Sequence, residues 1–186
     1  YRVGSVLVGL EQPDSSLYPQ WSATLERKNL PKVAVEAGYE ILLEPGITLE
    51  VVHPPSNPIG GPRPDRNNNG VVLRLVYGGV SFLLASDIEA EAENYLAVQG
   101  PVLESTVLKV PHHGSKTSTT KAFLARVDPA VAVVSVGEGN RFKHPSPEVV
   151  QRLGESVVPG GVYRTDQDGT IEFITNGETL WVRTER

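Results

Sequence analysis

Short apolar runs separated by turn-forming residues predict that this chain contains many brief strands. Residues 71–77 and 80–86 flank Gly78-Gly79 and predict a two-residue hairpin. Residues 130–136, AVAVVSV, are apolar almost throughout, as is typical of a strand buried on both faces of a sheet. The other predicted strands are residues 2–9, two short strands about a Pro-Gly turn within 39–52, residues 106–110, and a closing meander of 161–165, 169–175 and 179–184.

Helical patterns alternate with these strands. Residues 14–28 predict a helix opened by Asp-Ser-Ser, and residues 88–98 predict a helix with glutamates near its positive end. Two more helices are expected at residues 120–127 and 145–153. Alternating strands and helices with hairpins mixed in indicate an α/β fold with a mixed sheet. A length of 186 residues suffices for one compact domain.

A long loop is predicted at residues 53–70, where Pro, Gly and Asn dominate. Loops of this length inside compact domains are usually functional or mobile. His53 at its start has the chemistry of a ligand, but its position beside two prolines favours a structural role. The asparagines of residues 67–69 favour a turn, and can alternatively offer an amide to a ligand.

Composition excludes several kinds of site. The chain has no cysteine, so disulfides, thiolate metal sites and cysteine nucleophiles are ruled out. No segment approaches the roughly 18–20 apolar residues that span a bilayer, and a secretory signal pattern is absent. The chain begins at Tyr1 and contains no methionine, which favours a piece of a longer polypeptide.

Charge is unevenly distributed. The whole chain carries −5, which argues mildly against a general nucleic-acid binder. Between Lys109 and Lys143, however, six Lys and Arg face two Asp and Glu, so this stretch carries +4 and the rest of the chain −9. The stretch suits a path for phosphates, and a solvated face with chance asymmetry is an equal alternative.

Asp87 is the first candidate for chemistry. It follows the strand predicted at 80–86 and precedes a helix, so its carboxylate can either cap that helix or bind a ligand. Ser86 and Glu89 match an S-x-x-E capping box, which would satisfy the helix start and leave the Asp87 carboxylate available.

His112 and His113 follow the strand predicted at 106–110. A strand-helix-strand unit brings the carboxyl ends of parallel neighbours together, so Asp87 and His112 are expected to converge. One carboxylate oxygen and one imidazole nitrogen suit a divalent ion such as Zn²⁺ or Mn²⁺. The alternative is one structural histidine and one that faces solvent. The Gly-Ser that follows favours a ligand site, since glycine permits close approach and a serine hydroxyl can bond phosphate.

A second candidate cluster lies in the loop after residues 130–136. It comprises Asn140, Arg141, Lys143 and His144. Cationic and polar side chains at the end of a strand favour phosphate contact or general acid catalysis, and an ordinary loop surface is an equal alternative.

The order of these pieces resembles the carboxyl-terminal metallo-β-lactamase-like domain of the ComEC family, the bacterial competence channels that import transforming DNA. The resemblance runs from about residue 47 to residue 175 and rests on NNNGVVLRLVYGGVSFLLASD, VLKVPHHGSKTS, AVVSVGEGNRFKHPSPEVVQRL and VYRTDQDGTI. PHHGS together with NR-x-x-HP-x-PE is a specific combination. Two positions depart from the family pattern, which has Gly where this chain has Ser86 and Ser where it has Gly70.

The resemblance implies an αββα sandwich with mixed sheets that binds two divalent metal ions, Mn²⁺ or Zn²⁺, and hydrolyses phosphodiesters. Asp87 would then bridge the metals and His112 would be a ligand. His113 would support the metal site or contact phosphate, and His144 would face the substrate, which makes both candidate catalytic residues. The candidate phosphate-binding residues are Ser115, Lys116, Asn140, Arg141 and Lys143.

The family's H-x-H-x-D-H motif is absent from this chain. We therefore expect residues 1–186 to be a metallo-β-lactamase-like domain that lacks its amino-terminal half, and this fragment alone can be metal-free. The implied partners are DNA, that missing half, and a membrane-embedded channel part of the same polypeptide. The implied location is the bacterial cell membrane, with this soluble domain on the extracytoplasmic side.

Three functional hypotheses follow. The first is a metal-dependent DNA nuclease domain that degrades the non-transported strand during uptake. The second is a non-catalytic module that guides DNA or acts as a scaffold in the same channel, which the absent motif favours. The third is a phosphoesterase on small substrates, which a narrow pocket near Asp87 would favour over an open basic groove.

Overall fold

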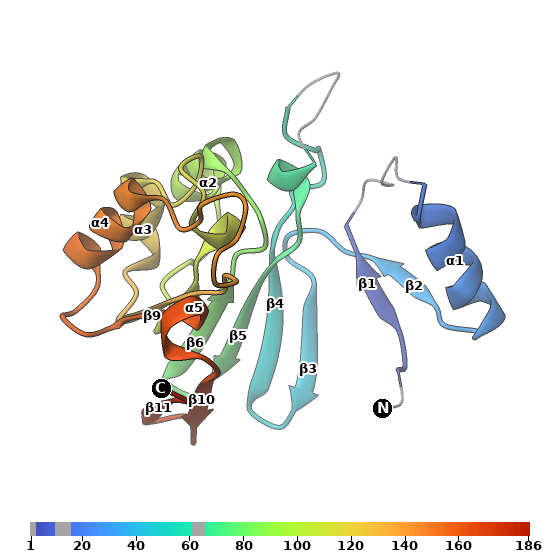
Figure 1. Cartoon of the computed structure of the whole chain (residues 1–186). Helices are drawn as coiled ribbons and strands as arrows, with labels where there is room; N and C mark the ends of the chain where they lie inside the picture. Colours follow the sequence, from blue (N-terminus) through green and yellow to red (C-terminus); the bar gives the residue numbers. More distant parts are fainter. Residues whose placement is uncertain (1–2, 10–15, 61–65) are drawn as a thin grey trace.

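A seven-stranded mixed sheet organises the computed structural model, which describes residues 3–9, 16–60 and 66–186 (Figure 1). Its first four strands form an antiparallel meander, and three further strands add to it in parallel. In spatial order they are β3 (Glu40–Glu44), β4 (Ile47–His53), β5 (Val72–Tyr77), β6 (Val80–Leu84), β7 (Val107–Lys109), β8 (Val131–Val134) and β9 (Val162–Arg164). The prediction of an α/β fold with a mixed sheet is confirmed.

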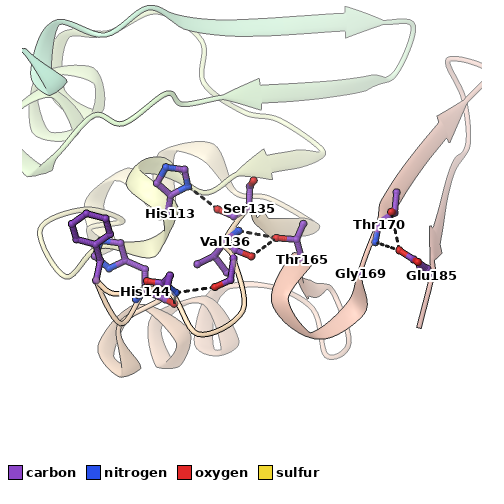
Figure 2. A pocket seen from close by; sticks show the side chains of 11 residues that line it. His113, Ser135, Val136, His144, Thr165, Gly169, Thr170 and Glu185 are labelled. Atoms are coloured by element: carbon purple, nitrogen blue, oxygen red, sulfur yellow. Dashed lines mark hydrogen bonds between the residues drawn. The ribbon is translucent and has the colours of Figure 1, made fainter. Parts of the chain in front are cut away.

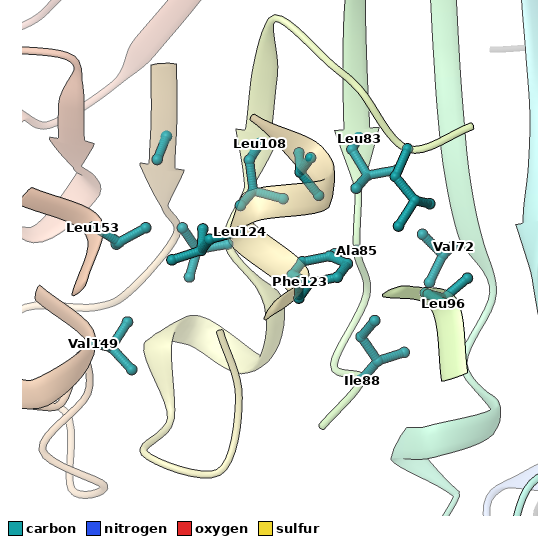
Figure 3. Packing of buried hydrophobic residues seen from close by; sticks show 14 of the residues in the cluster. Val72, Leu83, Ala85, Ile88, Leu96, Leu108, Phe123, Leu124, Val149 and Leu153 are labelled. Carbon is teal, nitrogen blue, oxygen red and sulfur yellow. The ribbon is translucent and has the colours of Figure 1, made fainter. Parts of the chain in front are cut away.

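Three helices cover one face of this sheet, each following a parallel strand. They are α2 (Ala90–Gln99), α3 (Lys121–Val127) and α4 (Pro147–Ser156). The core lies between them and the sheet, and Figure 3 shows Val72, Leu83 and Leu108 of the strands among Phe123 and Leu153 of the helices. Burial of such side chains contributes roughly 1.5–3 kcal/mol each, and this packing fixes the strand ends that carry the candidate site.

The opposite face of the sheet is apolar but only partly covered. Leu49, Leu75 and Phe82 are register partners across β4, β5 and β6 and therefore share this face. Each is only partly buried, and Leu84 on the same face is 40% exposed. The prediction that the strand at 130–136 is buried on both faces is therefore wrong, because in β8 buried residues alternate with half-buried ones.

Two small sheets flank the main one. β1 (Val6–Val8) and β2 (Lys32–Ala34) pair in parallel, with α1 (Tyr18–Arg27) between them in the sequence. They lie beside the β3 end of the main sheet (Figure 1). The predicted helix at 14–28 is thus shorter than expected, and positions 14 and 15 lie outside the described residues.

The predicted closing meander is wrong in its first strand. β9 pairs in parallel with β8, and the short helix α5 (Thr165–Asp168) separates it from the hairpin of β10 (Ile171–Thr175) and β11 (Leu180–Thr184). Phe173 of β10 packs edge-on against Phe82, with ring centroids 5.9 Å apart, so the hairpin covers part of the apolar face. Among the described residues, none of the helices combines the length and apolar character that crossing a membrane requires.

Candidate functional site

The candidate residues lie in the loops that follow three adjacent parallel strands. Asp87 follows β6, His112 and His113 follow β7, and His144 lies in the loop after β8. These strands are neighbours in the sheet, so their carboxyl ends meet at one edge. The backbones of the two loops meet, because the His112 N–H donates to the Ser86 carbonyl at 3.2 Å. The expected convergence of the Asp87 and His112 side chains stays a prediction, since the structure places Asp87 beside His113 and Glu89 beside His112.

The backbone at this edge is held in an uncommon conformation. Ser86, His112 and His113 have φ angles of 52°, 47° and 54°, in the left-handed region that non-glycine residues seldom adopt. Such a residue costs on the order of 1–3 kcal/mol and clusters at functional sites. Positive φ at His112 and His113 lies within the short 3₁₀ segment η2 (Pro111–Gly114), so the strain is concentrated where the two imidazoles are presented.

Gly114 fixes the distance between the two histidine loops. A Cβ atom on Gly114 would lie 2.6 Å from the Pro145 Cβ, and the Gly114 carbonyl accepts a hydrogen bond of 2.9 Å from the Ser146 N–H. The glycine therefore permits close packing against the residue that follows His144. The sequence suggested that Gly114 permits the close approach of a ligand. In the structure, the loop that contains Pro145 and Ser146 makes this approach.

His113 and Asp87 form the first imidazole–carboxylate pair. The Nε2 atom of His113 lies 3.7 Å from Oδ1 of Asp87, and both side chains are partly exposed. The other ring nitrogen of His113, Nδ1, donates to the Ser135 carbonyl at 2.7 Å (Figure 2). A backbone bond at one nitrogen fixes the ring and leaves the second nitrogen directed at the carboxylate, as in histidines that bind metal ions.

His112 and Glu89 form the second pair. His112 Nδ1 lies 3.0 Å from Oε1 of Glu89, a close contact that does not meet hydrogen-bond geometry. The Asn67 amide donates to the same carboxylate oxygen at 3.3 Å. From the sequence, Glu89 belongs to the predicted capping box and to the glutamates near the positive end of the predicted helix, and no signal marks it as a partner of His112.

The capping-box prediction is wrong, because a residue distant in the sequence caps α2. Oδ1 of Asn68 accepts hydrogen bonds from the backbone N–H groups of Glu89, at 3.0 Å, and Ala92, at 3.3 Å. Asn68 lies in the 3₁₀ turn η1 (Asn67–Asn69), so the predicted turn of residues 67–69 is also confirmed. This cap frees the carboxylates of both Asp87 and Glu89 for the histidines.

Lys109 places an amino group close to Asp87. Its Nζ donates to the Ser86 carbonyl at 3.4 Å. Burial lowers the pKa of Lys109, and the nearby Asp87 carboxylate opposes that shift. From the sequence, Lys109 counted only as part of the basic stretch between residues 109 and 143.

His144 completes the group of imidazoles. Its ring packs edge-on to that of His112, with centroids 5.8 Å apart. The pKa of His144 is lowered by burial, and further by His112 and His113. Asn140 holds this residue in place, because its amide donates to the His144 carbonyl at 2.7 Å and its Oδ1 accepts from the His144 N–H at 3.0 Å.

The candidate phosphate-binding residues occupy different environments. Ser115 is buried, and its Oγ lies 2.9 Å from the Thr117 hydroxyl. The Asn140 side chain is hydrogen-bonded to the backbone of its own loop. Lys116, Arg141 and Lys143 are exposed, and the Arg141 guanidinium lies over the Phe142 ring, 4.8 Å from its centroid.

A cavity of about 680 Å³ opens beside these histidines. His113 and His144 line one side. Thr170, just before β10, and Glu185, just after β11, lie across from them (Figure 2). The Glu185 carboxylate accepts from both the N–H and the hydroxyl of Thr170, at 2.9 Å each, so the far wall is acidic and the near wall carries imidazoles.

The donor types at this edge suit a divalent ion, because carboxylates and oriented imidazoles are the ligands that Zn²⁺ and Mn²⁺ accept. The number of donors does not suffice. Over residues 3–9, 16–60 and 66–186, His, Asp and Glu side chains form no group of three arranged to hold a metal ion. The residues present fit part of a metal site.

Comparison with known proteins supports the resemblance found in the sequence. No family model matches the chain. It is 41% identical over 108 residues to ComE operon protein 3 of Bacillus subtilis, 38% identical over 110 residues to Competence protein ComA of Neisseria gonorrhoeae, and 40% identical over 87 residues to Recombination protein 2 of Haemophilus influenzae. The matches cover 47–59% of this chain and 11–16% of these relatives. The resemblance to the ComEC family is thereby confirmed over about half of the chain.

Proposed function

We propose that this ComEC-like chain is part of a metal-dependent phosphodiesterase that cleaves DNA during competence and degrades the strand that is not transported. One observation carries the proposal. Two imidazole–carboxylate pairs, His113 with Asp87 and His112 with Glu89, lie with His144 at the carboxyl ends of adjacent parallel strands. Loops at this edge of an α/β sheet are where such proteins place their chemistry.

Asp87 and His112 would hold metal. His113 could be a further ligand, because its Nε2 faces the Asp87 carboxylate. The metal ions would lower the pKa of a bound water and stabilise the charge on the phosphate. The chain's own residues do the rest. The Ser135 carbonyl fixes the His113 ring, and the pair of bonds from Asn140 holds His144 beside His112, where an imidazole can give or take a proton at the substrate.

The basic stretch supplies the attraction for a nucleic-acid backbone. Lys109 lies near Asp87, whereas Arg141 and Lys143 project from the exposed loop after β8. These cations would offset the net negative charge of the chain where phosphates would bind.

The proposal requires metal ligands beyond the residues described. We propose that they belong to an amino-terminal half of the domain carried by a longer polypeptide, which also contains a membrane channel and places this domain on the extracytoplasmic side. The competence and recombination proteins that match this chain are longer by several fold, and this supports the idea.

The test uses that longer polypeptide, purified with Mn²⁺ or Zn²⁺ and assayed on labelled linear DNA. Asp87→Asn and His112→Ala are expected to reduce cleavage at least about 100-fold and to lower metal content, while the melting temperature changes little. Glu178→Gln, an exposed carboxylate in the β10–β11 loop, is the matched control and should cleave normally. Full activity in both site variants would refute the assignment.

A second candidate function is a module that guides DNA without cutting it. The lack of a three-ligand group among the described residues favours it. The same preparation distinguishes the two. Metal bound stoichiometrically with cleavage supports the nuclease, whereas DNA binding without metal uptake or cleavage supports the guiding module.

A further inference from the structure

An exposed aromatic side chain stands at the rim of the cavity. Phe142 is 63% exposed in a loop whose backbone is bonded to the Asn140 side chain. Its ring stacks on that of His144, with centroids 5.8 Å apart and planes inclined by 15°. The Arg141 guanidinium also lies over the Phe142 ring. A large apolar side chain that is exposed in a hydrogen-bonded loop beside a cavity indicates a binding surface.

These contacts form a continuous ladder of planar groups. It runs from the Arg141 guanidinium to Phe142, then to His144, and then edge-on to His112 in the proposed site. Planar cations and aromatic rings are the groups on which unpaired bases stack in proteins that bind single-stranded nucleic acid.

We propose that Arg141 and Phe142 form a stacking platform for the base of an unpaired nucleotide, so that the chain takes single-stranded DNA in preference to duplex. The inference rests on the proposed function for its choice of DNA as the ligand. A base in a duplex is already stacked on its neighbours and offers no free face, whereas a base in a single strand does.

Charge decides where the attached phosphates lie. The near wall of the cavity presents His113 and His144, with Lys143 exposed in the same loop. The far wall presents the Glu185 carboxylate, which repels phosphate. A base on Phe142 therefore directs its phosphate away from Glu185 and along the side that carries Lys143 and the histidines.

The experiment measures dissociation constants of the 186-residue chain by fluorescence anisotropy, in a chelator and at fixed low salt. The probes are a labelled single-stranded 12-mer, the same 12-mer with abasic sites, and a 12-base-pair duplex. Phe142→Ala should weaken binding of the normal single strand by about 5- to 150-fold. It should leave the affinity for the abasic strand unchanged, and Phe142→Trp should restore tight binding.

Trp181→Ala is the matched control, because Trp181 is an aromatic side chain on β11 that is 47% exposed. It should bind the single strand as the wild type does. A second readout places Phe142→Trp in a chain carrying Trp21→Phe and Trp181→Phe, where the single strand should quench the emission of the new tryptophan and the abasic strand should not.

The outcomes separate this inference from the proposed function. If Phe142→Ala binds the normal strand as tightly as the wild type, or loses affinity equally for the abasic strand, the platform is refuted whatever the cleavage assay shows. If the wild type does not prefer the single strand to the duplex, the platform is refuted as well. A failure to cleave DNA leaves the platform standing, since the binding is measured without metal.

Discussion

His53 and Asn68 link the long loop to the start of α2. The His53 ring is fully buried, and its Nε2 donates to the Asn68 carbonyl at 2.8 Å. The Asn68 side chain in turn caps α2 through Glu89 and Ala92. Burial lowers the pKa of His53, so the ring is neutral near pH 7, with the proton on Nε2. His53 is thus structural, as its position beside two prolines suggested.

Protonation of His53 predicts a pH dependence of stability. Because the folded-state pKa is lowered, the neutral ring contributes stability that is fully present above the unfolded pKa of about 6.5 and is lost as pH falls through the lower folded value. His53→Gln should be less stable than the wild type at pH 8 and should lose this pH slope. Urea unfolding between pH 5 and pH 8 measures both, and parallel slopes in the two proteins would contradict the prediction.

Asn140 should matter through the loop that it holds. Its amide also donates to the Gly137 carbonyl at 3.1 Å, in addition to its two bonds with His144. Asn140→Ala removes these bonds and should speed hydrogen exchange in residues 137–146, while the free energy of unfolding falls by only about 1–2 kcal/mol.

The control for this loop is Asn176→Ala. Oδ1 of Asn176 accepts from the N–H groups of Glu178 and Thr179 in the β10–β11 loop, so the variant loses similar bonds away from the histidines. It should leave exchange in residues 137–146 unchanged. Equal protection of these residues in the wild type and Asn140→Ala would show that the Asn140 side chain does not hold the loop.

At the scale of elements, a buried carboxylate joins α2 to α3. Glu93 of α2 is fully buried and accepts hydrogen bonds from the Thr119 N–H and, at 2.6 Å, from the Thr120 N–H. Thr120 caps α3 through its own side chain, which accepts from the Phe123 N–H. Burial raises the pKa of Glu93, although the two N–H donors oppose the shift.

Glu93 should therefore act on stability in the opposite direction to His53. A raised folded-state pKa means that its contribution is fully present below the unfolded value of about 4.3 and is lost as pH rises through the folded value. Glu93→Gln should remove this slope. Because the neutral amide avoids burying a charge, the unfolding free energy of Glu93→Gln relative to the wild type should be most favourable at pH 7 and least favourable at pH 4. Urea unfolding from pH 4 to pH 7.5 would contradict the prediction if the variant kept the wild-type slope.

Local sequence patterns predicted the elements whose causes are local. The hairpin of β5 and β6 follows from two apolar runs about Gly78-Gly79, and the strands within 39–52 follow from their Pro-Gly turn. The errors have distant causes. Asn68 caps α2 from about twenty residues away in the sequence, and β9 pairs with β8 across an intervening helix, which no period within residues 161–165 reveals.

The sequence predicted where the candidate site lies, at the ends of adjacent strands. It did not predict which histidine contacts which carboxylate. The end-of-strand positions of Asp87 and His112 indicated a common edge, and the His112–Ser86 backbone bond confirms it. The positive φ angles of His112 and His113 turn the two rings toward different carboxylates, Glu89 and Asp87. Two adjacent histidines in the sequence carry no information about that choice, because it depends on strained backbone angles.

At the scale of the whole molecule, the sheet face opposite the helices is apolar but only partly covered. The face includes Leu49, Leu73 and Leu75 and ends at Leu84, and the β10–β11 hairpin covers part of it through the contact between Phe173 and Phe82. An αββα sandwich packs a second sheet against such a face. We propose that further residues of a longer polypeptide provide that sheet.

Adjacent leucines on β6 test the proposal, because they face opposite sides of the sheet. Leu83 is fully buried under the helices, whereas Leu84 is 40% exposed on the uncovered face. Leu83→Ala should cost about 2–5 kcal/mol of unfolding free energy both in this chain and in a polypeptide extended upstream. Leu84→Ala should cost less than about 1 kcal/mol here and at least about 2 kcal/mol in the extended polypeptide, where the side chain would be buried. An equally small cost of Leu84→Ala in both polypeptides would mean that the upstream residues do not cover this face.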